Sequence, residues 1–250
     1  MLPSAGGRPS VAEPITRLLS PRMVEILAGA VVDRPPGPRY VQALRYVELT
    51  FPSTVPRSAT LRRWRGSLAG PLEVGLVVPY GARVGAAGPF RRDEELDERI
   101  GWVLDAADAL EAAHLVLPTG RELTTGTKDR ARFAGYLDAL RTGGRPIVWA
   151  AAGLWEAELA QPVARELGLR CAFDPLVDPA PPGDVAHARL RALGGRQRFG
   201  DGVLFDLVDR LEALEVTKAY VAIESPRSFR EAVRLAELAG GPAAPADGEG

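Results

Sequence analysis

Cysteine and lysine are scarce in this sequence, and the shortage of cysteine limits the kinds of site that the chain can form. Cys171 is the one cysteine, which excludes a disulfide framework and a cysteine-based metal site. Lysine accounts for only two of the 31 basic residues, Lys128 and Lys218. Because alanine, glycine and proline are abundant, this usage indicates a compositional bias of the genome rather than a functional requirement.

Long apolar runs and an excess of one charge are also missing. No run approaches the ~18 apolar residues of a membrane-spanning helix, and no basic-apolar-small leader opens the chain. The formal net charge is -1, so no overall field attracts nucleic acid or an anionic membrane. These absences predict a cytoplasmic protein that binds neither membranes nor nucleic acid, and no pattern indicates a cofactor.

The two ends of the chain differ in composition from its middle. Residues 1–21 are rich in proline, glycine and serine and predict a flexible arm. Residues 240–250 cannot bury apolar surface and predict a disordered tail. Residues 22–239 contain no linker and predict one domain, and the total of 250 residues suits one (β/α)8 barrel.

Eight short apolar runs in the middle of the chain alternate with helical patterns. Most are almost continuously apolar, as expected for strands that are buried on both faces of a parallel sheet. Eight such strands, alternating with helices in one domain, favour a single TIM-like (β/α)8 barrel over an open sheet. The predicted strands are Val24–Ala28, Leu44–Leu49, Leu72–Val78, His114–Leu117, Pro146–Ala150, Leu169–Phe173, Ala186–Leu190 and Lys218–Ile223.

Apolar residues at helical spacing predict helices in six of the connecting segments. The connections after the first and sixth strands lack this pattern, and Pro35–Pro38 and Pro179–Gly183 predict loops or single turns there. The predicted helices are Ala59–Leu68, Asp93–Ala113, Asp129–Leu140, Trp155–Leu167, Val203–Leu214 and Ser228–Leu238.

Six segments share their order and spacing with the motifs of one protein family. They are Tyr46–Leu49 (YVEL), Pro56–Trp64 (PRSATLRRW), Leu115–Pro118 (LVLP), Ile147–Trp155 (IVWAAAGLW), Ala188–Leu190 (ARL) and Tyr220–Leu235 (YVAIESPRSFREAVRL). On these segments the chain resembles domain-of-unknown-function family 72, also called YecE-like, over about residues 23–239. The resemblance implies a TIM-like barrel and a pocket at the carboxyl ends of its strands. It implies no reaction, because the family's activity is not established.

The chain departs from this family where the family has polar residues at its strand ends. Apolar or altered residues stand at those positions, among them Thr50, Val78, Pro79, Val116, Trp149, Ala151, Ala152, Arg191, Glu224 and Ser225. Acid–base or metal chemistry needs several convergent polar groups. The resemblance therefore implies a divergent member that keeps the scaffold and lacks most of the family's polar site.

Glu48 is the leading site candidate, because it is a lone carboxylate in the carboxyl half of an apolar strand. It is either a general base or cation ligand, or a buried carboxylate paired with Arg189. Asp174 is either a turn residue or a partner of Glu48, in a carboxylate dyad or, with His187, in a divalent metal site. We predict no metal, and we expect His114 and His187 to be structural.

Further candidates lie near the other predicted strand ends. Alternation places His187, Arg189 and Arg191 on one face of the seventh strand, where they suit a small anionic ligand or bridge acids. Glu224 is either an acid at the rim or a cap for the last helix. The loop that carries Arg121 and Lys128 either binds an anion or is a plain surface lid. Trp149 and Trp155 either pack in the core or a lid, or form a platform for a sugar ring.

Two hypotheses for function remain after these observations. The first is a degenerate, non-catalytic barrel that acts as a binding or assembly component, with a protein partner or a second copy of itself. The second is a hydrolase or phosphodiester/sugar-phosphate enzyme with a site rebuilt from Glu48, Asp174, His187, Arg189 and Glu224. The second hypothesis requires these side chains to converge.

Overall fold

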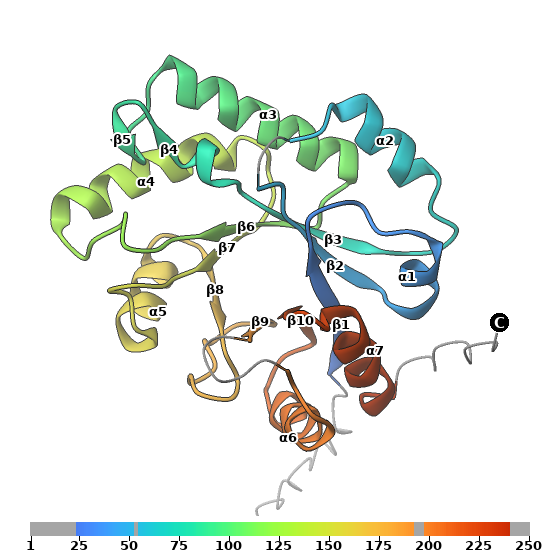
Figure 1. Cartoon of the computed structure of the whole chain (residues 1–250). Coiled ribbons are helices and arrows are strands. Elements are labelled where there is room, and N and C mark those ends of the chain that lie inside the picture. The colour runs from blue at the N-terminus through green and yellow to red at the C-terminus, as the bar shows by residue number, and fades with distance from the viewer. Residues whose placement is uncertain (1–23, 53–54, 193–197, 241–250) are drawn as a thin grey trace, which may run out of the picture.

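Eight parallel strands close into a barrel in this computed structural model, which describes residues 24–52, 55–192 and 198–240. Around the barrel the order is β1-β10-β9-β8-β7-β6-β3-β2, so strands that neighbour each other in sequence also pair (Figure 1). The barrel strands are β1 (Glu25–Val32), β2 (Tyr46–Leu49), β3 (Glu73–Val77), β6 (His114–Pro118), β7 (Ile147–Ala150), β8 (Arg170–Phe173), β9 (Val185–Arg191) and β10 (Lys218–Glu224).

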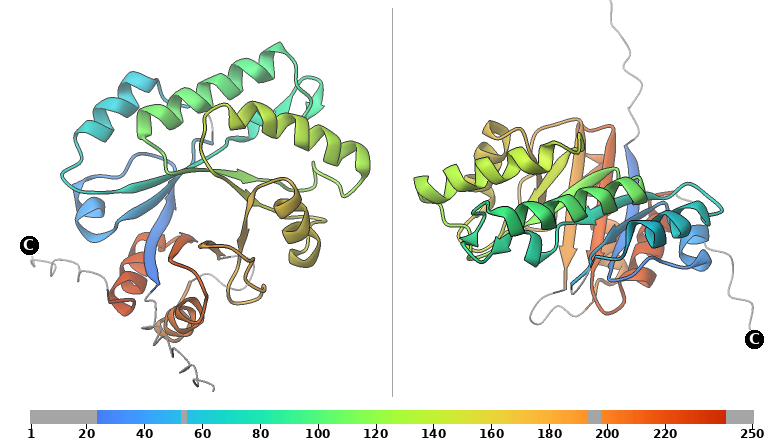
Figure 2. Two further views of the ribbon diagram at one scale, coloured as in Figure 1. Left: turned by 180° about the vertical axis from the view of Figure 1, so that it is seen from behind. Right: turned by 90° about the horizontal axis from the view of Figure 1, so that it is seen from above.

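Helices surround the barrel and cover its outer face (Figures 1 and 2). They are α1 (Pro38–Ala43), α2 (Ser58–Gly66), α3 (Glu94–Leu110), α4 (Thr127–Arg141), α5 (Ala157–Glu166), α6 (Asp201–Glu212) and α7 (Ser228–Leu238). A 3-10 turn, η1 (Tyr80–Ala82), and a small hairpin of β4 (Val84–Gly85) and β5 (Gly88–Pro89) precede α3. Within the described residues, no helix is both long and apolar enough to cross a membrane.

All eight predicted barrel strands are confirmed, and so is the single TIM-like barrel. The first strand extends further than predicted, to Val32, and pairs with β10 over six positions and with β2 over four. No helix connects β8 to β9, as the segment Pro179–Gly183 predicted. The first connection, predicted as a loop or single turn, contains the short helix α1 of six residues. It begins at Pro38, a residue that suits the first turn of a helix because its φ is already helical. The predicted arm at residues 1–21 and nearly all of the predicted tail lie outside the described residues.

The barrel interior is unusual because polar and aromatic side chains fill much of it. Such interiors are normally layers of valine, isoleucine and leucine. Here strand alternation points Tyr46 and Glu48 of β2 inward, and both are almost fully buried. An opposing apolar group, Val77, Val116 and Val148, packs with Ala150 and Ala172 as a cluster separate from the main core. The interior therefore has a polar side and an apolar side.

Gly75 on β3 makes room for the polar side of the interior. A Cβ at this position would lie 2.7 Å from Nε2 of His114 and 2.8 Å from the hydroxyl of Tyr46. Both distances are well below van der Waals contact, so only glycine lets these two side chains occupy the barrel centre. The main core lies outside the strands, where the helices pack against the barrel.

Candidate functional site

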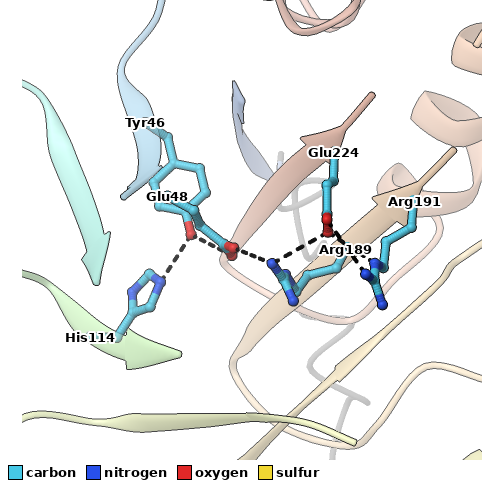
Figure 3. A network of polar contacts seen from close by, with 6 residues as sticks. All are labelled: Tyr46, Glu48, His114, Arg189, Arg191 and Glu224. Atoms are coloured by element: carbon cyan, nitrogen blue, oxygen red, sulfur yellow. Dashed lines mark hydrogen bonds and ion pairs between the residues drawn. The ribbon is translucent and has the colours of Figure 1, made fainter. Parts of the chain in front are cut away.

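Glu48 lies at the end of β2 that faces the barrel mouth, the opening formed by the carboxyl ends of the strands. Its side chain is 3% exposed, and its Oε2 lies 2.9 Å from Nη2 of Arg189 on β9 (Figure 3). The pairing with Arg189 predicted from the sequence is thus present. A buried carboxylate is normally retained only with such a partner.

Tyr46 supplies the second contact of Glu48. Its hydroxyl donates a hydrogen bond of 3.1 Å to Oε1 of Glu48 and lies 3.0 Å from Nε2 of His114 on β6. Sequence reasoning missed Tyr46 as a site residue. The two-residue spacing to Glu48 could have identified it, since positions i and i+2 of a strand share one face.

The network continues from Arg189 to the rim of the barrel. Glu224, at the end of β10, accepts a 2.9 Å hydrogen bond from Nε of Arg191 and lies 3.9 Å from Arg189. The prediction that Glu224 caps the last helix is wrong, because its carboxylate points to these arginines (Figure 3). The hydroxyl of Ser225 instead accepts from the backbone N–H of Arg227 at the start of α7.

Two acids and two bases make up this mouth network, which we define as Glu48, Glu224, Arg189 and Arg191. Glu48 and Arg189 are buried, whereas the side chains of Glu224 and Arg191 are 42% and 47% exposed. Burial raises the pKa of Glu48, and the charge of Arg189 opposes that rise. Burial also disfavours the charge of Arg189, but Glu48 and Glu224 outweigh it and raise the pKa of that guanidinium.

The two histidines lie deeper in the barrel, below the mouth network. Their rings meet edge to face with centroids 4.6 Å apart, and His187 stacks on Tyr220 at 4.9 Å. Burial lowers the pKa of His114 to about 3 and that of His187 to about 2, so both rings are neutral at pH 7. Nε2 of His187 lies 3.3 Å from Nη1 of Arg170. A cation this close to His187, together with the buried ring contacts, supports the predicted structural role of both histidines.

Asp174 is a turn residue. Its Oδ1 accepts a 2.9 Å hydrogen bond from the backbone N–H of Leu176, and its carbonyl accepts from Val177 and Asp178. The turn interpretation is confirmed, and the dyad with Glu48 receives no support from these contacts. Among the described residues, no group of three or more histidine, cysteine or acidic side chains is placed to hold a metal ion.

The two tryptophans do not offer the ligand surface that one interpretation gave them. Trp149 is fully buried and donates a 2.8 Å hydrogen bond to Thr119, and Trp155 donates one of 3.0 Å to the carbonyl of Leu123. Their rings pack edge to face with centroids 5.0 Å apart. Both side chains are buried in the main core, so these contacts favour internal packing and give no support to a ligand-binding role.

Arg121 and Lys128 lie apart from the tryptophans and from the mouth network. Both are exposed, Arg121 in the loop after β6 and Lys128 in the first turn of α4. Neither belongs to the four charges at the mouth. Anion binding at this loop stays a prediction.

A cavity of about 590 Å³ lies beside the mouth network, among the segments that follow β2 and β3. Its lining includes Phe51, Pro56 and Trp102, between the loop before α2 and the face of α3. We place the candidate site at the mouth network instead, because the interior charges converge there. Arg99, a cation of this cavity, is already used by the carbonyl of Gly81 at 3.0 Å.

Known structures share this fold. A DUF72 family protein from Enterococcus faecalis has a TM-score of 0.65 and 13% identity, with 87% of this chain and 96% of that chain covered. A xylose isomerase domain containing protein from Salmonella typhimurium has a TM-score of 0.54 and 15% identity, with coverages of 83% and 93%. A D-allulose 3-epimerase from Methylomonas, in complex with D-allulose, has a TM-score of 0.52 and 12% identity, with coverages of 87% and 96%.

These similarities show a TIM-barrel fold. No protein-family model matches the chain, and no curated protein matches it in sequence. The first of the three proteins is a DUF72 family protein, from the family whose motifs the sequence resembles. At such low identity the shared property is the barrel, and the chemistry of the site rests on this chain's own residues.

Proposed function

We propose that this protein binds a small anionic ligand at the barrel mouth and performs no acid–base or metal catalysis there. The observation that carries the proposal is the mouth network itself. It brings two arginines to one opening, and Arg191 is half exposed at the rim. Guanidinium groups recognise carboxylates and phosphates through paired hydrogen bonds.

Glu224 holds the arginines in place without blocking them. Its ion pair with Arg191 is solvent-exposed, and pairs of this kind contribute only about 0–1 kcal/mol. An anionic ligand therefore competes with Glu224 for the guanidinium groups at little cost. The half-buried Ala150 and Ala172 on the opposite side of the interior suit the carbon skeleton of such a ligand.

The residues that a catalytic mechanism would need are already engaged. Glu48 is held by Arg189 and Tyr46, and Asp174 is held in a turn. A general base must reach a substrate proton and have a pKa suited to accepting it. The neutral histidines lie beneath Glu48, so neither is presented to a ligand at the rim.

Equilibrium titrations with acetate, inorganic phosphate and a sugar phosphate test the binding proposal. We expect Arg191→Gln to weaken anion binding about tenfold or more, the effect of losing a charge-assisted hydrogen bond. Glu224→Gln should strengthen it, because the competing carboxylate is gone. Arg121→Gln is the matched control, since it removes an exposed arginine from the loop site and should leave the affinity unchanged.

Two results would overturn the proposal. Binding that is lost in Arg121→Gln and kept in Arg191→Gln would move the site to the loop after β6. Turnover of a phosphodiester or glycoside substrate that disappears in Glu48→Gln would show a rebuilt catalytic site, as the alternative hypothesis requires.

A further inference from the structure

We propose that anion binding at the mouth is coupled to the uptake of one proton by Glu48. The inference rests on the proposed function and adds a property that the binding site alone does not require. In the ligand-free protein Glu48 is a carboxylate paired with Arg189. In the complex it is a neutral carboxyl group, and the proton comes from solvent.

The two oxygens of Glu48 have different surroundings. Oε1 accepts the hydrogen bond from Tyr46. Oε2 is buried and has no directed hydrogen bond, although it lies 2.9 Å from Nη2 of Arg189. The ionised state of Oε2 therefore depends on the nearby positive charge, and Oε2 is the oxygen that takes the proton when this charge is shared.

Arg189 is the group that an incoming anion shares with Glu48. Its Nη2 lies between two carboxylates, at 2.9 Å from Glu48 and 3.9 Å from Glu224. Its Nε is buried and lacks a hydrogen-bond partner among the described residues. A ligand anion here draws the guanidinium charge away from Glu48 and brings a like charge closer. Both changes favour the protonated carboxyl group.

The contacts below Glu48 allow this change without rearrangement. The hydroxyl of Tyr46 has one proton, which it donates to Oε1, so it accepts the N–H of Nε2 from His114. Oε1 remains an acceptor when Oε2 binds a proton. Tyr46 and His114 thus hold the side chain in the same place in both protonation states.

The histidines, the tyrosines and Arg189 around Glu48 keep their charge between pH 6 and pH 8. The histidines have pKa values of about 3 and about 2, the raised pKa values of the tyrosines keep them neutral, and the raised pKa of Arg189 keeps it charged. Proton exchange in this range therefore reports on the acids of the mouth. The surrounding groups are Tyr40 of α1, Tyr46 of β2, His114 of β6, Arg170 of β8, His187, Arg189 and Arg191 of β9, and Tyr220 and Glu224 of β10.

Titration calorimetry at pH 7, in two buffers with different ionisation enthalpies, measures the protons bound with the ligand. Acetate and sulfate are the probes, since both keep a constant charge from pH 6 to pH 8. We expect uptake approaching one proton per anion in the wild type, and a dissociation constant that rises up to tenfold per pH unit. Glu224→Gln should keep this uptake, whereas Glu48→Gln should show none and bind with an affinity independent of pH.

The outcomes separate this inference from the proposed function. Anion binding without proton uptake in the wild type overturns the coupling and leaves the binding function intact. Proton uptake that is lost in Glu224→Gln and kept in Glu48→Gln would identify Glu224 as the acid that takes the proton. This result would also overturn the coupling to Glu48. No binding in the wild type or in Glu224→Gln overturns both. If Glu48→Gln does not fold, proton uptake in the wild type and in Glu224→Gln still tests the coupling.

Discussion

Acidification from pH 7 to pH 5 should destabilise this protein through its two histidines. The chain contains only His114 and His187, and both are buried and neutral in the barrel. Their pKa values lie far below the value of about 6.5 that histidine has in an unfolded chain. The contribution of the two histidines to the free energy of unfolding is therefore fully present above pH 6.5. It is lost as the pH falls below 6.5, because only the unfolded state takes up these protons.

The magnitude follows from proton linkage. Between pH 7 and pH 5, each histidine with a native pKa below 4 costs about 1.9 kcal/mol of unfolding free energy, so the pair costs about 4 kcal/mol. Glu48 acts in the opposite direction, because its raised pKa lets the folded state bind a proton first. Asp97 and Asp129 have lowered pKa values and lose their contribution only at more acidic pH.

Urea unfolding at pH 8, 7, 6 and 5, followed by tryptophan fluorescence, measures the effect. The double variant His114→Gln/His187→Gln removes both titrating groups and keeps Glu48, so its comparison with the wild type isolates the histidines. We expect the loss between pH 7 and pH 5 to shrink by about 4 kcal/mol in the variant. Equal pH dependence in both proteins would refute the buried, neutral state of the histidines.

Three further changes test the packing around the site by urea unfolding. Gly75→Ala should lower the free energy of unfolding by about 1–3 kcal/mol through overpacking. The control Gly101→Ala, whose new methyl group meets open space on α3, should be neutral or stabilising by up to about 1 kcal/mol. Equal effects of the two substitutions would contradict the tight packing around Gly75. Glu48→Ala should cost about 3–5 kcal/mol by stranding Arg189, and Glu48→Leu with Arg189→Met should recover most of it. Trp149→Phe should cost about 1–3 kcal/mol, because it removes a buried hydrogen bond, and a neutral result would contradict that bond.

The barrel was predictable because its strands are buried on both faces. Almost continuous apolar runs marked most of the eight, and the absent helix after β8 was visible as a proline-rich segment. The hairpin of β4 and β5 was not predictable, since two-residue strands with glycine carry no periodic pattern. Helix α1 was missed because a run of prolines looks like a loop until its last member begins a helix.

Strand alternation was enough to predict which site residues point into the barrel. It was not enough to predict which of several available partners a side chain contacts. The pair of Glu48 with Arg189 followed from two opposite charges on inward positions. The position of Glu224 did not, because an acid before a helix is equally suited to capping it. Tyr46 was overlooked because a tyrosine in an apolar strand reads as ordinary packing until a partner for its hydroxyl is known.

The pairing of β1 on both sides has a consequence for the order of events during synthesis. β1 joins β2 on one edge and β10 on the other, so it has one unpaired edge until β10 leaves the ribosome. β9 also has an open edge until then, because its second neighbour is the same strand. Unpaired edges are templates for pairing with other chains. A nascent chain that ends between β9 and β10 is thus the form of this protein most in need of a chaperone.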